Sequence, residues 1–390
     1  MSPVHICIIA YKRLIIESRL LRQVRTFRNR GWEVTLAGFV EPGDVLEEVN
    51  VLPLSQVQHK RSWSIPQALA RWMLPAVIAW RLHPQNREAR INLHGVAKHF
   101  DYIIAHDWEC APLAYELATK YCIPFGVDVH EYARRQFCPT GRWLRDWVNT
   151  HIHGGHAHAI QRNYLHLASG ITTVCDGFAD LLQNEYNLRK RPGVVRSVPF
   201  YQECPFRPCG ERIRILYHGV VDFDRNLDVL LHAVPLLEKR YIVEIRGPAR
   251  EEYLHELKFL AKSLGVGERV CFTTPVAFSQ VVSEANMADI GYVVFSEFSL
   301  QRTYNLPNKF FENTMAGLAL CVSGSQEMAR LIDIYQHGVV LKDCLPEVVA
   351  KTLNALTRAD INEMKYASLR AAKELCWEKE EKQMLAAYNL

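Results

Sequence analysis

The chain has 390 residues, of which 49% are hydrophobic and 23% are charged, and its formal net charge is +4. This length suits two domains, and the apolar fraction lets each bury its own core, which excludes an intrinsically disordered protein. The small net charge gives no indication of a nucleic-acid partner.

The N-terminal region predicts no signal peptide, because no basic segment followed by a long apolar one is present. The longest apolar candidate for a membrane span, residues 72–80, is far shorter than the ~20 residues that a transmembrane helix needs. Eleven cysteines lie at irregular spacings, several of them inside apolar runs. We therefore expect free thiols in a cytoplasmic protein.

Short apolar runs alternate with segments of helical period along the whole chain, which is typical of parallel sheets covered by helices. The predicted fold class is therefore α/β. In the first half, strands are predicted at 4–10, 33–39, 49–54, 102–106, 124–129 and 170–174. Helices are predicted at 14–30, 111–120 and 176–186.

The alternation pauses between residues 189 and 211, where four prolines interrupt it, and then resumes. We therefore predict one domain at 1–203 and a second at 204–365. The remaining residues, 366–390, are expected to form a C-terminal helix that packs toward the first domain. Strands of the second domain are predicted at 213–217, 242–246, 270–274, 290–295 and 318–323.

Two long inserts, 57–100 and 141–167, are helix-like and rich in tryptophan and arginine. This mixture suits a membrane–water interface or a ligand groove. An ordinary helical insert that buries its tryptophans against the first sheet explains the composition equally well, so both interpretations stay open.

The strongest functional signal is the segment Leu-Pro-Asn-Lys-Phe-Phe-Glu that begins at Leu306. Pro307 suits the first helical turn because its missing N–H would have no partner there. The free amides of a helix that starts near Asn308, together with the Lys309 ammonium, suit a diphosphate. Glu312, one turn later, can accept hydrogen bonds from two ribose hydroxyls. A Lys309–Glu312 salt bridge on a solvated face is the alternative, but ligands of open α/β sheets bind where this segment lies, after a strand.

Other strand ends of the second domain add to this predicted site. Gly219 lets the backbone approach a phosphate, and Arg225 can hold phosphate oxygens bidentately. With Lys309 they form a cationic site that can stabilise a leaving diphosphate without a metal. Arg246 follows the next strand and is expected at the same edge, with a plain turn as the alternative. Contacts to the nucleotide base are expected near Val276.

Acid/base-capable residues follow two neighbouring strands of the first domain. Asp128, His130 and Glu131 end one strand and are the catalytic candidates. His106 and Asp107 end the other strand and are expected on the acceptor side, that is, beside the molecule that receives the transferred group. Each histidine alone could be structural, but their coincidence at one sheet edge favours function.

Cys204 and Cys209 lack the second pair that a zinc site needs. The histidine repeat of 151–158 could ligate a metal, but its irregular spacing favours a solvated or interfacial stretch. We therefore expect no metal and no other cofactor.

Together these stretches resemble the GT-B glycosyltransferases, in particular family 4, over nearly the whole chain. The resemblance implies two Rossmann-like domains facing a central cleft, with a C-terminal helix that crosses back. It assigns Lys309 and Arg225 to the donor diphosphate, Glu312 to its ribose, and His130 to the transferred sugar. Many members carry a glutamate where this chain has Tyr304, a position that holds the transferred sugar; we keep Tyr304 among the donor-binding residues.

The resemblance implies transfer of a sugar from a UDP- or GDP-sugar to a glycan, lipid-linked or protein acceptor, with retention of configuration and without a metal. The resemblance also agrees with a role in polysaccharide biosynthesis and with peripheral contact between the protein and the inner face of the membrane. Two alternatives remain: a nucleotide-sugar epimerase or hydrolase of the same fold, and a non-catalytic nucleotide-sugar-binding subunit of a glycosylation complex. The sequence does not determine the base, the sugar, the acceptor or the oligomeric state.

Overall fold

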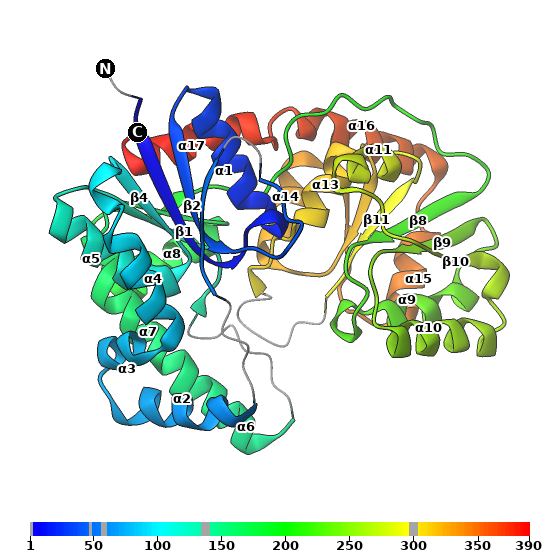
Figure 1. Ribbon diagram of the computed structural model, residues 1–390. Helices are drawn as coiled ribbons and strands as arrows, with labels where there is room; N and C mark the ends of the chain where they lie inside the picture. Colours follow the sequence, from blue (N-terminus) through cyan, green and yellow to red (C-terminus); the bar gives the residue numbers. More distant parts are fainter. Residues whose placement is uncertain (1–2, 47–48, 56–60, 134–140, 296–302) are drawn as a thin grey trace. The chain divides into compact units, whose positions relative to one another are not determined.

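The computed structural model describes residues 3–46, 49–55, 61–133, 141–295 and 303–390, and their side chains except those of 61–65. The chain forms two compact units (Figure 1). The first contains residues 1–196 and 381–390, and the second contains 197–380 apart from 299–301. Residues following 196 join the second unit through backbone contacts, such as the 2.8 Å hydrogen bond from Trp377 N to Pro199 O.

The first unit is built on a seven-stranded parallel sheet with the strand order β3-β2-β1-β4-β5-β6-β7. Its central strands are apolar runs buried on both faces, as parallel sheets require. The strands are β1 His5–Arg13, β2 Glu33–Phe39, β3 Asn50–Pro53, β4 Tyr102–His106, β5 Phe125–Val129, β6 Gly170–Thr173 and β7 Gly193–Val194. The six predicted strands are confirmed, whereas β7 is too short to produce an apolar pattern.

Helix α1 (Ser18–Asn29) shows why the helices of this unit form where they do. Leu20, Val24 and Phe27 recur at helical spacing and are buried, so the helix packs its apolar face onto the sheet. The predicted helix 14–30 is thus split into a 3-10 turn and α1. The other helical segments are η1 Leu14–Ile16, α2 Arg61–Met73, α3 Ala76–Leu82, α4 Pro84–His94, η2 Ala97–His99, η3 Trp108–Cys110, α5 Ala111–Tyr121, α6 Trp143–Trp147, the π-helical η5 Val148–His153, α7 Gly154–Tyr164, η6 Leu165–Leu167 and α8 Asp176–Tyr186.

The two tryptophan-rich inserts form a helical layer of α2, α3, α4, α6 and α7 on the first unit (Figure 1). Trp80 is 3% exposed, as expected for a tryptophan packed against the unit's core. Trp72 and Trp143 are instead 65% and 80% exposed. Neither interpretation of the inserts therefore holds for all of the tryptophans.

The second unit has a six-stranded parallel sheet with the order β10-β9-β8-β11-β12-β13. Its strands are β8 Ile213–His218, β9 Tyr241–Arg246, β10 Val270–Thr273, β11 Ile290–Val293, β12 Ala319–Val322 and β13 Gly338–Val340. The five predicted strands are confirmed, and the short β13 was not predicted. Its helical segments are η7 Phe223–Arg225, α9 Leu227–Ala233, η8 Val234–Leu236, α10 Glu251–Ser263, η9 Gly267–Arg269, η10 Phe278–Gln280, α11 Val281–Ala285, α13 Asn308–Met315, α14 Gln326–Tyr335, α15 Pro346–Asn354 and α16 Arg358–Ala372.

The C-terminal segment is two helices, whereas the sequence predicted one. Helix α16 ends at Ala372, and α17 runs from Trp377 to Tyr388. The final residues of α17 belong to the first unit, as expected. Glycines of the first sheet make room for them: a Cβ atom at Gly170 would lie 2.2 Å from the carbonyl oxygen of Ala387.

Among the described helices, none is both long and apolar enough to cross a bilayer. The ten described cysteines are free thiols.

Candidate functional site

Asp128 lies at the carboxyl end of β5, directly beside His106 in the register of β4 and β5. Its carboxylate accepts two hydrogen bonds from Arg19, at 2.7 and 2.8 Å, and one from Gln23, at 2.6 Å. Thr172 donates another, at 2.7 Å. Helix α1 supplies Arg19 and Gln23, one turn apart on its buried side, so the helix and the sheet together fix the orientation of this carboxylate.

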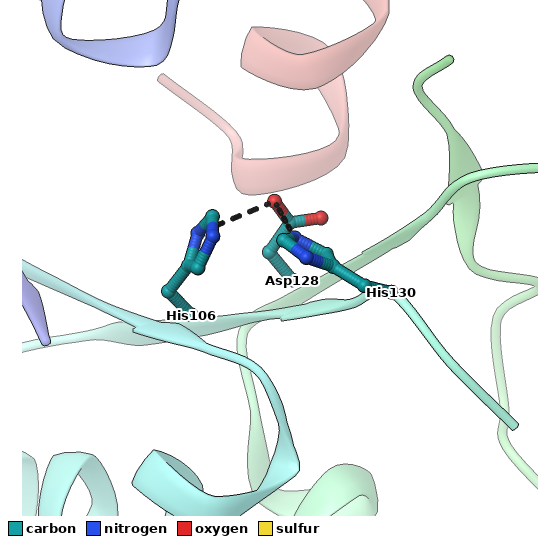
Figure 2. A group of neighbouring side chains, drawn as sticks. All are labelled: His106, Asp128 and His130. Atoms are coloured by element: carbon teal, nitrogen blue, oxygen red, sulfur yellow. Dashed lines mark hydrogen bonds and ion pairs between the residues drawn. The ribbon is translucent and has the colours of Figure 1, made fainter. Parts of the chain in front are cut away.

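His130 is held by the same carboxylate. Its Nε2 lies 3.0 Å from Asp128 Oδ2, and its ring meets that of His106 edge to face, with 4.2 Å between centroids (Figure 2). A histidine that donates Nε2–H to Asp128 keeps Nδ1 as a hydrogen-bond acceptor. The side chain of His130 is 12% exposed, so the ring is not fully enclosed by the protein.

The electrostatics of this cluster fix two protonation states. Burial alone would raise the pKa of Asp128, but the charge of Arg19, with the hydrogen bonds from Arg19 and His130, outweighs burial and holds the pKa well below its usual range. Burial lowers the pKa of His106 to about 4, so this ring is neutral at neutral pH. The cluster therefore contains a fixed anion beside a neutral histidine.

His106, Asp128 and His130 are also the one group among the described residues whose ligand atoms are close enough to share a metal ion. The chemistry of the group argues against that use. A carboxylate offers about four lone-pair positions, and Arg19, Gln23, Thr172 and His130 already direct donors at them. The guanidinium also repels a second cation.

Asp107 has a backbone conformation that non-glycine residues rarely adopt, with φ of 81° and ψ of 160°. Its N–H donates to Asp128 O at 2.9 Å, and its carboxylate accepts from Trp108 N at 2.9 Å, so contacts on both sides hold the turn. Lys12 Nζ lies 3.7 Å from the same carboxylate. Glu131, beyond the end of β5, is exposed.

In the second unit, Lys309 lies in the first turn of α13, which has no side-chain cap. Its Nζ is 3.9 Å from the centre of the Tyr217 ring and forms no hydrogen bond or ion pair with a described residue. A Cβ atom at Gly219, where φ is +112°, would lie 3.4 Å from that nitrogen. The ammonium therefore borders the space beside Gly219, into which the Cβ atom of any other residue would project.

Glu312 follows one turn after Lys309, as the sequence predicts for neighbours on one helix face. The buried His218 lies next to it, with Nδ1 3.6 Å from Glu312 Oε2 and Nε2 3.1 Å from Asn313 Oδ1. Burial and the charge of Lys309 lower the pKa of His218 to about 3. A neutral, buried histidine thus packs beside Glu312 and Asn313 in α13.

The two arginines predicted for the donor site differ in their surroundings. The Arg225 guanidinium lies 5.2 Å from the ring of Phe295, which Lys309 Nζ also approaches, at 5.4 Å. Arg246 is buried, and its guanidinium donates two hydrogen bonds to Glu244, at 2.7 and 3.0 Å. Arg225 thus lies near Lys309 and pairs with the neighbouring Asp224, at 3.2 Å, whereas Arg246 is engaged within β9.

The remaining donor-site predictions lie on loops or helix ends. Val276 is half-buried in the loop after β10, and Tyr304 is half-buried in the turn before α13. Leu306 is buried, and Asn308 is exposed as the first residue of α13. Pro307 precedes the helix as its N-cap instead of lying inside its first turn.

Sequence reasoning missed Arg19, Gln23 and His218. A usable signal existed for the first two, because Arg19 and Gln23 are four residues apart and adjoin the buried Leu20 and Val24. His218 directly precedes Gly219 and ends the strand, so it could have been named with the strand-end candidates.

The sequence matches no protein-family model, and no curated protein matches it. Solved structures do match. The chain is similar to WaaG, a glycosyltransferase involved in lipopolysaccharide biosynthesis, with 13% identity, 98% of this chain and 99% of the other covered, and a TM-score of 0.64. It is similar to Anabaena HepE in complex with UDP and glucose, with 13% identity, 99% of each chain covered and a TM-score of 0.68. It is also similar to sucrose-phosphate synthase from Thermosynechococcus elongatus, with 12% identity, 99% of this chain and 98% of the other covered, and a TM-score of 0.71. The chain therefore has the GT-B fold that the sequence predicts.

Proposed function

We propose that the protein is a glycosyltransferase that moves a sugar from a UDP- or GDP-sugar to a hydroxyl of a glycan, lipid-linked or protein acceptor. The observation that carries the proposal is the Lys309 ammonium beside Gly219, without an acidic partner among the described residues. An unpaired cation that borders open backbone space suits a diphosphate.

In this proposal the donor binds to the second unit. Lys309 and Arg225 contact the diphosphate, and Glu312 accepts hydrogen bonds from the ribose. During transfer, the bond between the anomeric carbon and the diphosphate oxygen breaks, a bond to the acceptor oxygen forms, and the acceptor's proton leaves with the diphosphate. The two cations stabilise the negative charge that develops on the leaving group, so no metal ion is needed for that task.

In the first unit, the proposal gives His130 the role of contacting the transferred sugar. Asp128 fixes the ring of His130 and is itself fixed by Arg19. Asp128 is therefore a positioning residue, since its low pKa and saturated carboxylate do not suit it to accept a proton. Nδ1 of His130 remains as an acceptor for a sugar hydroxyl.

The test is a thermal-shift screen of the full-length protein with UDP, GDP, ADP, CMP and dTDP, without added metal and again with Mg²⁺. One diphosphate at 100 times its dissociation constant should add ~2.7 kcal/mol of stability. Lys309→Met and Glu312→Gln should reduce the shift, while Lys258→Met, an exposed lysine of the same unit, should not. A shift with none of the nucleotides, or one that Lys309→Met leaves intact, contradicts the donor site.

Product analysis separates the enzyme classes. A transferase consumes the donor sugar when an acceptor is present and leaves a glycoside product, whereas an epimerase changes the sugar while it stays bound to the nucleotide. A hydrolase releases free sugar without an acceptor. Nucleotide binding without any turnover supports a non-catalytic subunit and contradicts our proposal.

We further propose that the protein acts at an anionic membrane surface, which it contacts through the exposed face of α2, α3 and α6. Trp72, Met73, Leu82 and Trp143 are each more than 60% exposed on these helices. Residues 61–95 and 141–166 contain eight arginines and two acidic residues, so their formal charge is +6, against +4 for the whole chain. Exposed aromatic residues among cations suit a lipid interface, and the excess charge suits anionic headgroups.

Vesicle sedimentation tests this surface. The protein should bind vesicles of phosphatidylcholine with phosphatidylglycerol, and binding should fall with added salt and with neutral vesicles. Trp72→Ser with Trp143→Ser should weaken it, while Phe259→Ser, an equally exposed aromatic residue of the second unit, should not. Equal binding by both variants contradicts the assignment.

A further inference from the structure

A cavity of ≈ 210 Å³ lies inside the first unit, at the carboxyl ends of β1, β2 and β4. Its wall is completed by α2, α3, α4, α7 and η3. None of the residues assigned above to the donor or to the Asp128 cluster lines it. We propose that this cavity binds a neutral sugar ring of the acceptor, which the Glu109 side chain and Arg71 hold by hydrogen bonds. The inference rests on the proposed glycosyltransferase function and adds an acceptor class to it.

The aromatic side chains of the cavity suit one face of a sugar ring. Trp80 from α3 and Trp108 from η3 both line it, with Phe39 from the end of β2. The Trp80 indole is fixed, because its Nε1 donates to the backbone carbonyl of Glu109 at 2.9 Å. Trp108 meets His156 edge to face at 6.2 Å. Rigid aromatic walls present an apolar surface to the C–H face of a sugar without losing side-chain entropy on binding.

The polar groups of the cavity suit its hydroxyls. Glu109 is a solvent-accessible residue at the cavity, and its carboxylate forms no hydrogen bond or ion pair with a described residue. Its two oxygens can accept from adjacent hydroxyls. Arg71 donates one hydrogen bond to His153, at 2.9 Å, and keeps other N–H groups for a ligand. Cavities with apolar walls and a few placed polar groups are typical of small-ligand sites.

The ionised form of Glu109 is unfavourable for the stability of the free, folded protein. Although Glu109 stays in contact with solvent, partial desolvation by the surrounding walls of the cavity, with the nearby negative charge of Asp107, raises the pKa of Glu109 to about 7. A carboxyl group that is unfavourable in the folded state and has no internal partner is typical of a residue kept for binding rather than for stability.

A second, smaller cavity of ≈ 140 Å³ shares Arg71, Ala79 and His83 with the first. It extends along α2 and α3 past Pro66 and Leu82. The two cavities are therefore neighbours, and the second lies beside Leu82, which belongs to the exposed face of these helices.

The test uses the full-length protein and a panel of methyl glycosides of glucose, galactose, mannose and N-acetylglucosamine. Binding at millimolar concentration should change the tryptophan fluorescence, because Trp80 and Trp108 line the cavity. Glu109→Gln should weaken binding at least tenfold. Glu88→Gln, a carboxylate of α4 outside the cavity, should bind as the wild type does.

The inference is overturned if no glycoside of the panel changes the fluorescence, or if Glu109→Gln binds as tightly as the wild type. UDP is titrated against the same preparations. A protein that binds UDP but no glycoside leaves the proposed transferase standing without this acceptor site. A protein that binds glycosides but no nucleotide diphosphate loses the proposed function and keeps a sugar-binding cavity.

Discussion

The ammonium group of Lys309 lies over the ring of Tyr217, with 3.9 Å between Nζ and the ring centre. Burial and the neighbouring charge of Arg225 lower the pKa of Lys309 to about 7. The site therefore contains a lysine that is only partly charged at neutral pH. A bound diphosphate favours the charged form, so nucleotide binding and protonation are coupled.

We expect UDP binding at pH 8 to take up about one proton per nucleotide, because a lysine that is mostly neutral in the free protein becomes charged in the complex. At pH 6 the lysine is already charged, and the uptake should disappear. Calorimetric titration in buffers of different ionisation enthalpy measures it. In Lys309→Arg, binding should proceed without uptake, since arginine stays charged. Unchanged uptake in that variant would exclude Lys309 as the source.

Gly219→Ala should lower nucleotide affinity about tenfold, because its Cβ would lie 3.4 Å from Lys309 Nζ, in the space proposed for the diphosphate. The positive φ also strains alanine, so stability should fall by ~1 kcal/mol. Gly265→Ala is the control, since φ there is +68° and no atom lies within 4 Å of the added Cβ. Equal losses of affinity in both variants would show that strain alone is responsible.

Arg19→Met should destabilise the protein by ~3 to 5 kcal/mol, because it leaves the buried Asp128 carboxylate without its cation. The low pKa of Asp128 contributes stability that is present above pH ~4 and is lost as the pH falls through the folded-state pKa. The difference between variant and wild type should therefore narrow in acid. Urea denaturation at several pH values measures it. Arg191→Met breaks an exposed pair with Asp180 and should cost no more than ~1 kcal/mol.

Glu109→Gln should be more stable than the wild type above pH 7 and equal to it near pH 4. The folded protein holds the Glu109 proton more tightly than the unfolded chain, so wild-type stability falls as the pH rises through about 7. Other charged groups act on this carboxylate, namely Lys12, Arg71, Asp107 and Glu131. Thermal denaturation across this pH range checks the prediction, and parallel curves for both proteins would contradict it.

Gly170→Ala should displace the end of α17, because the added Cβ would lie 2.2 Å from the carbonyl oxygen of Ala387. Carboxypeptidase should then shorten the variant faster than the wild type. Gly155→Ala is the control, since it lies in α7 with no atom within 4 Å of the added Cβ, and a helical alanine stabilises by up to ~1 kcal/mol. Equal digestion rates would show that α17 tolerates the contact.

The strands could be predicted, as could the placement of Lys309 and Glu312 on one helix, because the signals are local. The apolar run of β4 is visible in the four consecutive residues 102–105, and Lys309 and Glu312 are three positions apart on one helix. The partners of Asp128 could not be predicted in the same way. Arg19 is more than a hundred positions away in the sequence, and only the packing of α1 onto the sheet brings it to β5.

The tryptophan-rich inserts show a second limit. Trp72 and Trp80 stand in similar apolar surroundings in the sequence, yet one is 65% exposed and the other 3%. The difference arises because Trp80 finds a hydrogen-bond acceptor in η3, a contact that depends on tertiary structure. Pattern alone therefore identifies the composition of this layer but not which side chains line the cavity.

The position of residues 381–390 in the first unit has a consequence for synthesis. Thr172 and Tyr388 share a hydrogen bond of 2.7 Å, and Thr172 also donates to Asp128. A ribosome-bound chain that has released every residue of the first sheet still lacks this last helix. Synthesis of the first sheet is therefore not enough to complete the first unit, and Gly170 and its neighbours stay uncovered until residues 381–390 have emerged.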